Sequence, residues 1–336
     1  MQSKPFTFNA TDGVAIYTYC WLPEEGIPIK AVIQLAHGMA EHAGRYEDFA
    51  QYMTDRGFAV YANDHRGHKK TAGSVDELGY FADNNGWNRV VADMCQLTEL
   101  IKGNHPKAPV FLFGHSMGSM LSREYVSRNG ARIDGVILSA TAGDPGFLGL
   151  VGGAIAKLEA MVRGKKAQSP LLDKLSFGQF NQAFKPNRTS FDWLSRDDGE
   201  VDKYIDDPYC GTIFTAGFFC DLLEGIRSIN NRRNIEQIPK SLPIYFFSGA
   251  EDPVGDFKKG VNRVVETFRD CGLLDVECKF YEGGRHEMLK ETNKEQVVDD
   301  TVADDSVSIF MTRKEMEDFL LMGRGFNWIN EYPFNR

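Results

Sequence analysis

Residues 110–118 read VFLFGHSMG, and this stretch decides the fold. The apolar run at 110–113 is typical of a strand buried on both faces, and a helical pattern begins directly after Gly118. The Gly-x-Ser-x-Gly motif between them would arise by chance in roughly one protein in ten of this length. A strand before it and a helix after it are what a nucleophilic serine on a sharp turn requires. The sequence therefore predicts Ser116 as a nucleophile, against the alternative of an incidental glycine-rich turn.

Strands and helices alternate on both sides of this motif. Short apolar runs rich in β-branched and aromatic residues predict buried strands, and apolar positions at helical spacing predict helices. Repetition of strand, helix and strand is typical of an α/β fold, with a mostly parallel sheet and helices on both faces. The expected strands are 31–36, 58–62, 110–113, 135–138, 242–247 and 276–281, and the expected helices are 46–56, 87–102, 119–127 and about 257–270.

The alternation stops between 143 and about 238, where the sequence is rich in Gly, Phe and Leu and contains no clear strand. A connection within a sheet takes a few residues and one helix, so this segment is too long to be one. Ligands of such sheets bind outside the carboxyl ends of the strands, and an insertion that starts there can cover the site. We therefore expect a core formed by 1–142 and 239–336, with a cap inserted at 143–238.

A serine hydroxyl needs a base that removes its proton, and the usual base is a histidine held by a carboxylate. When the serine stands on such a turn, the carboxylate and then the histidine follow it along the chain. Of the seven histidines, only His286 lies beyond Ser116. The order therefore assigns His286 as the base, against the alternative of a solvent-facing loop histidine.

The carboxylate is expected where the preceding strand ends. Residues 248–253 read SGAEDP and follow directly on a predicted strand. Asp252 stands at the tip of this turn, where Pro253 restricts the backbone. We predict Asp252 as the acid of the triad. Glu251 and Asp256 are the alternatives, and their simpler interpretation is a solvated loop carboxylate.

Attack on an ester carbonyl develops an oxyanion, which needs fixed hydrogen-bond donors. One donor is expected from the backbone N–H of Met117, the residue after the nucleophile. The other is expected after the strand 31–36, where His37-Gly38-Met39 stands and Met39 would supply the amide. A plain turn is the alternative interpretation of His37-Gly38.

Composition narrows the class of protein. With 42% hydrophobic and 25% charged residues, the 336-residue chain resembles an ordinary globular protein. The formal net charge is −9 and no basic stripe stands out, so we expect no nucleic-acid partner. The longest apolar stretch, 147–156, is about half of the ~20 residues that cross a bilayer, so no transmembrane span is expected.

We expect a cytoplasmic location, because residues 1–10 contain no secretory signal. The cysteines show no C-x-x-C pair and are read as reduced thiols. They stand at positions 20, 95, 210, 220, 271 and 278.

Several motifs carry a family resemblance: HGMAEHAGRY (37–46), DHRGH (64–68), GHSMG (114–118), DPVG (252–255) and RHEML (285–289). They are similar to the successive motifs of the α/β-hydrolase family that contains monoacylglycerol lipases and bacterial lysophospholipases. FDWLSRD (191–197) and DPYCG (207–211) resemble the cap of the bacterial members. The resemblance runs from about residue 6 to residue 291.

The resemblance implies an α/β-hydrolase fold and a serine esterase for monoacyl lipids or related carboxylic esters, without cofactor or metal. It places the triad on Ser116, Asp252 and His286 and the oxyanion amides on Met39 and Met117, in agreement with the residue-based analysis. It implies a small-molecule ester or monoacyl lipid as partner, with at most transient contact of the cap with lipid surfaces. Glu41, His42, Arg45 and Tyr46 are expected to brace the oxyanion loop.

The sequence departs from the family beyond Leu289. There the acidic stretch 297–306 replaces the usual direct passage into a closing helix. We expect a solvated surface loop in this stretch, because no calcium-loop spacing is present. The closing helix is then expected at 313–321.

Other functions were weighed against a lipid esterase. A metallohydrolase built on His37, His42, His65, His68 and Asp64 is disfavoured because zinc-hydrolase spacings are absent. A catalytically dead, ligand-binding fold is disfavoured because no triad member is missing. A short-chain carboxylesterase, or a peptidase or thioesterase, on the same scaffold remains open.

Apolar residues of the cap either line an acyl tunnel or form the cap's own core. These residues are Phe147, Leu148, Leu150, Ile155, Leu158, Met161, Phe214, Phe218, Phe219, Leu222 and Leu223.

Overall fold

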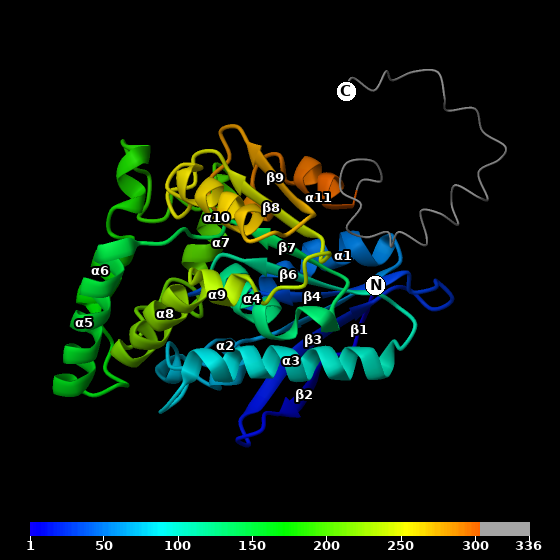
Figure 1. Ribbon diagram of the computed structural model, residues 1–336, viewed down its shortest axis with the longest axis horizontal. Coiled ribbons are helices and arrows are strands. Elements are labelled where there is room, and N and C mark those ends of the chain that lie inside the picture. Colours follow the sequence, from blue (N-terminus) through cyan, green and yellow to red (C-terminus); the bar gives the residue numbers. More distant parts are fainter. Residues whose placement is uncertain (303–336) are drawn as a thin grey trace.

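Within residues 1–302, which the computed structural model describes, a nine-stranded mixed sheet forms the centre of the molecule (Figure 1). The strands are β1 (Gln2–Ser3), β2 (Phe6–Asn9), β3 (Ala15–Leu22), β4 (Ala31–Ala36), β5 (Phe58–Asn63), β6 (Val110–His115), β7 (Gly135–Ser139), β8 (Ile244–Gly249) and β9 (Val276–Tyr281). They lie in the order β1-β3-β5-β4-β6-β7-β8-β9, with β2 beside β3. The pairs from β5 to β9 are parallel, whereas β1, β2 and β5 each pair antiparallel with β3.

The central strands are buried on both faces because their alternate side chains pack into two separate cores. Successive side chains of a strand point to opposite faces of the sheet. Val32 of β4 and Leu112 of β6 belong to the first core, whereas Ile33 and Phe113, the next residues of these strands, belong to the second. The near-continuous apolar runs in the sequence follow from this two-sided burial.

Helices cover both faces of the sheet, as the sequence predicted. These helices are α1 (Glu47–Asp55), α3 (Gly86–Asn104), α4 (Met117–Asn129), α10 (Lys259–Asp270) and α11 (Lys294–Val302). The apolar faces of α3, α4 and α10 pack into the first core. Those of α1 and α11 pack into the second. Shorter helical turns are η1 (Ala43–Tyr46), α2 (Lys69–Ala72), η2 (Val75–Glu77), η3 (Gly130–Arg132) and η5 (Met288–Lys290).

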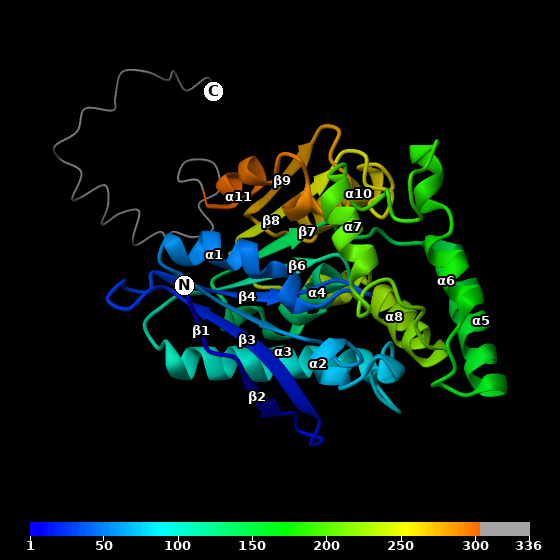
Figure 2. The same cartoon turned by 180° about the vertical axis from the view of Figure 1, so that it is seen from behind.

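Between β7 and β8 the described chain forms helices and loops without a strand. The helices are α5 (Gly146–Arg163), α6 (Pro170–Phe177), η4 (Phe180–Phe184), α7 (Asp198–Asp206), α8 (Ala216–Ile229) and α9 (Arg232–Ile235). Both views place α5 and α6 at one edge of the molecule, away from the sheet (Figures 1 and 2). Helix α8 packs against α5 on one side and α4 on the other, and its Phe218 and Phe219 join the first core.

The expected strands and helices of the sheet are present, with small shifts at their ends. The fifth expected strand, 242–247, is observed as β8 at Ile244–Gly249, because Pro243 precedes the paired residues. The sequence analysis did not predict β1, β2 and β3. These strands pair antiparallel at the edge of the sheet and are only partly buried, so they lack the continuous apolar run that identified the others.

The expectation of a surface loop at 297–306 is wrong for its described part. Residues 297–302 belong to α11, and Val297 and Val298 are buried in the second core. Asp300 accepts hydrogen bonds from Lys279 Nζ (2.7 Å) and Tyr281 Oη (2.9 Å). Asp299 and Asp300 therefore lie on the polar side of an amphipathic helix. The helix expected at 313–321 lies outside the described residues.

Among the helices of residues 1–302, none combines the length and the apolar character that crossing a membrane takes.

Candidate active site

Ser116 lies on a strained turn between β6 and α4. Its backbone has φ 52° and ψ −118°, a conformation that side-chain-bearing residues rarely adopt. Two glycines make the turn sterically accessible. A Cβ on Gly114 would lie 2.5 Å from the carbonyl oxygen of Gly118, and a Cβ on Gly118 would lie 2.0 Å from that of Ala36. The turn therefore fits closely against the end of β4.

The structure brings Ser116, His286 and Asp252 together into one hydrogen-bonded row. Ser116 Oγ lies 2.9 Å from His286 Nε2, and His286 Nδ1 lies 3.0 Å from each carboxylate oxygen of Asp252. The three residues follow β6, β9 and β8, so they meet where the carboxyl ends of neighbouring parallel strands converge. Of the alternative acids, Asp256 pairs instead with Arg263 (2.9 Å), and Glu251 is exposed.

Asp252 fixes both the orientation and the charge of His286. The buried carboxylate of Asp252 also accepts hydrogen bonds from the Val254 N–H (2.9 Å) and the Ser248 hydroxyl (3.2 Å). With Nδ1–H directed at this carboxylate, Nε2 is left to accept the proton of Ser116. Burial by itself lowers the pKa of His286, but the charge and hydrogen bond of Asp252 outweigh it and raise this pKa above 6.5.

The backbone amides expected to bind an oxyanion belong to residues that line the same cavity as Ser116. Met39 follows β4, and Met117 is the first residue of α4. Within residues 1–302, neither of these two N–H groups has a hydrogen-bond partner. Two free backbone donors in the cavity that Ser116 lines are the kind of arrangement that oxyanion stabilisation needs.

Glu41 braces the loop that carries Met39. Its carboxylate accepts hydrogen bonds from the Gly38 N–H (2.5 Å), Tyr46 Oη (2.8 Å) and Arg45 Nη1 (2.7 Å). Arg45 also holds Glu287, the residue after His286, through two bonds of 2.6 and 2.7 Å. The expected bracing by Glu41, Arg45 and Tyr46 is therefore present as contacts, and it extends to the histidine loop.

Trp193 and Glu287 had no role predicted from the sequence: Trp193 contacts His286, and Glu287 is the residue that follows it. The Trp193 ring centre lies 5.1 Å from that of His286, and the His286 N–H donates to the Trp193 carbonyl oxygen at 3.4 Å. The Glu287 N–H donates to the Leu194 carbonyl oxygen at 2.7 Å. Both residues belong to the sequence motifs 191–197 and 285–289, but only the folded chain places Trp193 against His286.

Ser116 lines a cavity of about 400 Å³. Gly38, Met39, Met117 and His286 line the same cavity. Its wall is mainly apolar, and the apolar lining includes Met120, Phe177, Phe180, Leu222, Leu223, Ile226 and Val254. An ester held over Ser116 can therefore place a hydrocarbon chain against this wall.

The apolar residues considered for an acyl tunnel divide into three groups. Leu222 and Leu223 line the cavity. Phe214, Phe218 and Phe219 are core residues, against which Ile155 packs. The remaining five are exposed on α5: Phe147, Leu148, Leu150, Leu158 and Met161.

The buried histidines near the oxyanion loop stabilise loops by mutual contacts. The His65 N–H donates to His37 Nε2 at 3.0 Å, and His37 Nδ1 donates to the Gly38 carbonyl oxygen at 2.8 Å. Burial lowers the pKa of His65 to about 3 and that of His68 to about 4. Asp64 accepts hydrogen bonds from two backbone N–H groups instead of facing these rings. The three histidines therefore support the loops as neutral rings, and Asp64 supports them by accepting hydrogen bonds from backbone N–H groups.

Comparison with known proteins supports this description. A family model described as serine aminopeptidase, S33, matches residues 27–293. A monoglyceride lipase of Rattus norvegicus is 29% identical over 295 residues, which cover 86% of this chain and 85% of that protein. A monoacylglycerol lipase of Mycolicibacterium smegmatis is 28% identical over 304 residues, with coverage of 88% and 95%. Among solved structures, a thermostable carboxyl esterase from Bacillus coagulans has a TM-score of 0.80 at 27% identity, covering 90% of this chain and 96% of that chain.

A serine hydrolase with the α/β-hydrolase fold is the class that this sheet and these relatives define. Its relatives among lipases and esterases make it a carboxylic ester hydrolase. The chain belongs to the serine aminopeptidase S33 family, because that family's model covers most of its length. The resemblance inferred from the sequence motifs is thereby confirmed.

Proposed function

We propose that the protein hydrolyses esters of monoacyl lipids, with monoacylglycerol preferred over lysophospholipid, through an acyl-enzyme on Ser116. The observation that carries the proposal is the apolar cavity that opens over the Ser116–His286–Asp252 row. The two lipases reported above, both named for monoacylglycerols, support the same substrate class.

The contacts support a two-step reaction. His286 Nε2 accepts the proton of Ser116, whose Oγ attacks the ester carbonyl carbon. The N–H groups of Met39 and Met117 stabilise the oxyanion, each contributing about 3 kcal/mol to the transition state. His286 then gives its proton to the leaving alcohol, and a water molecule repeats the sequence to release the fatty acid. Asp252 keeps the imidazole in the required tautomer and stabilises its charged form.

Charged residues in the cavity lining favour an uncharged head group. Asp144, Asp256 and Arg263 are among the lining residues, and the one guanidinium already pairs with Asp256 at 2.9 Å. A phosphodiester would meet excess negative charge among these three residues, whereas glycerol hydroxyls can donate to the carboxylates. We therefore rank monoacylglycerol above lysophospholipid.

We further propose that residues 143–238 work as a cap that meets lipid surfaces transiently. Helix α5 carries an apolar face that nothing in the described chain covers, with Phe147 76% and Met161 82% exposed. Lys157 and Arg163 of the same helix, and Lys165 and Lys166 after it, add positive charge near this face. Exposed apolar side chains beside basic ones are typical of helices that lie in a membrane interface.

We also propose a cytoplasmic location, which the cysteines support, and no nucleic-acid partner, which the overall charge supports. All six cysteines are free, which fits a reducing compartment such as the cytoplasm. The net charge of −9 disfavours nucleic acid as a partner.

The decisive experiment is a panel of monoacylglycerols, lysophospholipids and p-nitrophenyl esters of increasing chain length, assayed on purified protein. Burial adds ~0.8 kcal/mol per methylene, so kcat/KM should rise with chain length until the cavity is filled. Labelling of Ser116 by a fluorophosphonate should accompany activity. Absence of labelling would indicate a catalytically dead, ligand-binding fold.

Two alternative activities have specific support, and the same panel distinguishes them. The likeness to a carboxyl esterase favours short esters, which would be indicated by a maximum at acetate with a sharp loss by octanoate. The family description favours a peptidase, which would be indicated by faster cleavage of aminoacyl anilides than of any ester. Either outcome would overturn the lipid proposal while leaving the serine chemistry intact.

A further inference from the structure

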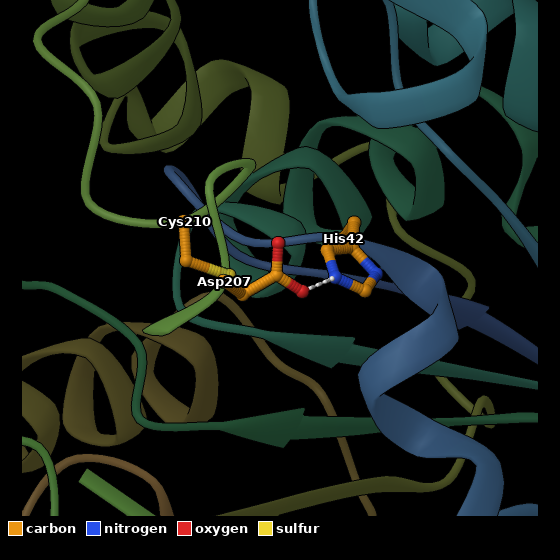
Figure 3. Close-up of side chains that lie close together, drawn as sticks. All are labelled: His42, Asp207 and Cys210. Carbon is orange, nitrogen blue, oxygen red and sulfur yellow. Dashed lines mark hydrogen bonds and ion pairs between the residues drawn. The ribbon is translucent and has the colours of Figure 1, made fainter. Parts of the chain in front are cut away.

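A second group of side chains with metal-ligand chemistry lies beside the oxyanion loop. Within residues 1–302, His42, Asp207 and Cys210 form the one group of three such residues whose ligand atoms all lie within 4.8 Å of one another (Figure 3). His42 Nε2 lies 2.8 Å from Asp207 Oδ2. His42 comes from the core loop after β4, whereas Asp207 and Cys210 come from the turn after α7.

The backbone of this turn holds two of the three groups at a chelating spacing. Asp207 and Cys210 are separated by two residues, the same spacing that joins paired ligands in many zinc sites. The Cys210 N–H donates to the Asp207 carbonyl oxygen at 2.9 Å, and the Tyr209 N–H donates to Asp207 Oδ1 at 2.9 Å. The turn is therefore closed before any ligand binds, which lowers the entropy cost of forming a site.

The geometry requires only a small closure around a cation. Ligand bonds of about 2.0–2.3 Å place tetrahedral ligand atoms roughly 3.3–3.8 Å apart. His42 Nε2 and Asp207 Oδ2 are already closer than this because a hydrogen bond joins them, and Cys210 Sγ, which lies within 4.8 Å of the other ligand atoms, has to approach by at most about 1.5 Å. Asp207 is 25% exposed on its side chain, which leaves a path for solvent and a fourth ligand position for water.

We propose that His42, Asp207 and Cys210 bind a thiophilic divalent cation such as Zn²⁺, and that this cation fastens the cap to the oxyanion loop. The Cys210 thiol loses its proton to solvent, and the single ring proton of His42 moves from Nε2 to Nδ1, so that thiolate, carboxylate and the Nε2 of a neutral imidazole coordinate the metal. No oxidation or reduction occurs. Neutral imidazole and thiolate are ligands that zinc prefers.

Lys69 allows a test of cation binding, because its ammonium group lies next to His42 and Asp207 and would repel a cation there. Its Nζ lies 2.9 Å from His42 Nε2 and 3.8 Å from Asp207 Oδ2. This positive charge neutralises part of the site and opposes a metal ion. Since the lysine side chain is long and partly exposed, it can move toward solvent when a cation binds.

Existing contacts show why a cation here would act on the oxyanion loop. The Ala40 carbonyl oxygen, next to Met39, accepts hydrogen bonds from the Gly211 N–H (3.0 Å) and Tyr204 Oη (2.9 Å). The metal-binding turn therefore already contacts the loop that holds Met39. Coordination through His42 would add bonds between the same two segments and restrict their relative motion.

The binding test uses Co²⁺ as a spectroscopic probe and Zn²⁺ in calorimetry, on full-length protein. We expect one equivalent of Co²⁺ to produce a thiolate-to-cobalt charge-transfer band that Zn²⁺ abolishes. Cys210→Ser should remove the band and, with Asp207→Asn, weaken Zn²⁺ binding at least about a hundredfold. Lys69→Ala should strengthen binding at least about fivefold, the effect of removing one like charge near 4 Å in water. Cys220→Ser, in another part of the cap segment, is the matched control and should bind as the wild type does.

Hydrogen exchange of backbone amides measures whether the cation restrains the cap segment against the oxyanion loop. This measurement does not depend on the proposed enzymatic activity. Zn²⁺ should slow exchange of the amides at 38–42 and 207–211 in wild-type protein and leave them unchanged in Cys210→Ser. Metal-free Cys210→Ser should keep the wild-type circular dichroism and melting temperature, so a loss of binding cannot be a loss of folding. Binding that persists in Cys210→Ser, binding that Lys69→Ala leaves unchanged, or wild-type protein without a one-to-one complex would each overturn the proposal.

Discussion

Arg45 and Glu287 form a two-pronged ion pair, with bonds of 2.6 and 2.7 Å, between the loop after β4 and the residue that follows His286. The Glu287 side chain is buried, and the Arg45 side chain is 11% exposed. Arg45 also bonds Glu41, which holds the Gly38 N–H, so one guanidinium connects the oxyanion loop with the histidine loop. The pair therefore positions two segments that are far apart in the sequence, without contacting the hydroxyl of Ser116.

We predict that Glu287→Gln lowers kcat about tenfold or more and leaves KM nearly unchanged, because loss of the charge relaxes the two loops. Breaking a buried ion pair should also lower the free energy of unfolding by about 3 kcal/mol. Steady-state kinetics and urea unfolding measure the two effects. Asp48→Asn, at an exposed partner of Lys290, is the control and should change stability by less than about 0.5 kcal/mol. An unchanged kcat in Glu287→Gln would contradict the positioning role.

Ser116→Ala and His286→Ala should each abolish nearly all turnover and leave the fold intact. The double variant should be little worse than either single variant, because Ser116 and His286 act as one unit across a 2.9 Å hydrogen bond. Hydrolysis of a fluorogenic ester and circular dichroism test both statements. Additive losses in the double variant, or full activity in His286→Ala, would refute the assignment.

Activity should fall as the pH decreases through a midpoint above 6.5. The reaction needs a neutral imidazole, so activity is lost when His286 gains a proton. Asp252 raises the pKa of His286 against the opposing effect of burial, so this loss should begin at a higher pH than for an ordinary histidine. In Asp252→Asn the midpoint should move to lower pH, and the rate should fall by about 10⁴ because the tautomer is wrong. The profile of kcat/KM between about pH 5 and 9 measures both. A wild-type midpoint at or below 6.5 would be inconsistent with the ion pair.

Leu223→Trp should shift the preferred acyl chain of the substrate to a shorter length. Leu223 lines the cavity over Ser116, and a larger side chain fills part of the space that methylene groups would occupy. Leu158→Trp is the matched control, since Leu158 is exposed on α5 and lies outside this cavity. Chain-length profiles with micelle-free esters measure the shift. Equal profiles for the two variants would mean that the acyl chain binds elsewhere.

His68→Gln should make unfolding less sensitive to acid. Burial holds the pKa of His68 at about 4, so below pH 6.5 the unfolded chain binds a proton that the folded chain does not. This difference removes about 1.4 kcal/mol of stability per pH unit as the pH falls. Glutamine can still donate to the Arg66 carbonyl oxygen, which His68 Nδ1 contacts at 2.9 Å. Urea unfolding at pH 6 and pH 5 should therefore give a smaller difference in His68→Gln than in wild type, and equal differences would contradict a neutral His68.

The central sheet was predictable because its strands are buried on both faces. Burial on both sides requires consecutive apolar residues, as in 31–36 and 110–113, and such runs are visible without a structure. The strands β1, β2 and β3 at one end of the sheet escaped prediction because their partial exposure mixes polar residues into them. Helix α11 was misread as a loop because Val297 and Val298 are its only described residues in the second core, too few to give a helical period.

The chain order of Ser116, Asp252 and His286, and the glycines around Ser116, are properties of the sequence itself. A single histidine beyond the serine motif leaves one candidate base, and a side chain at Gly118 would collide with the end of β4. Only the tertiary structure places Trp193 against His286, joins Arg45 to Glu287, and brings His42 to the turn at Asp207 and Cys210. These contacts join residues dozens to hundreds of positions apart. No local pattern specifies them, because they depend on which strand ends the sheet brings together and on how the chain between β7 and β8 packs over these ends.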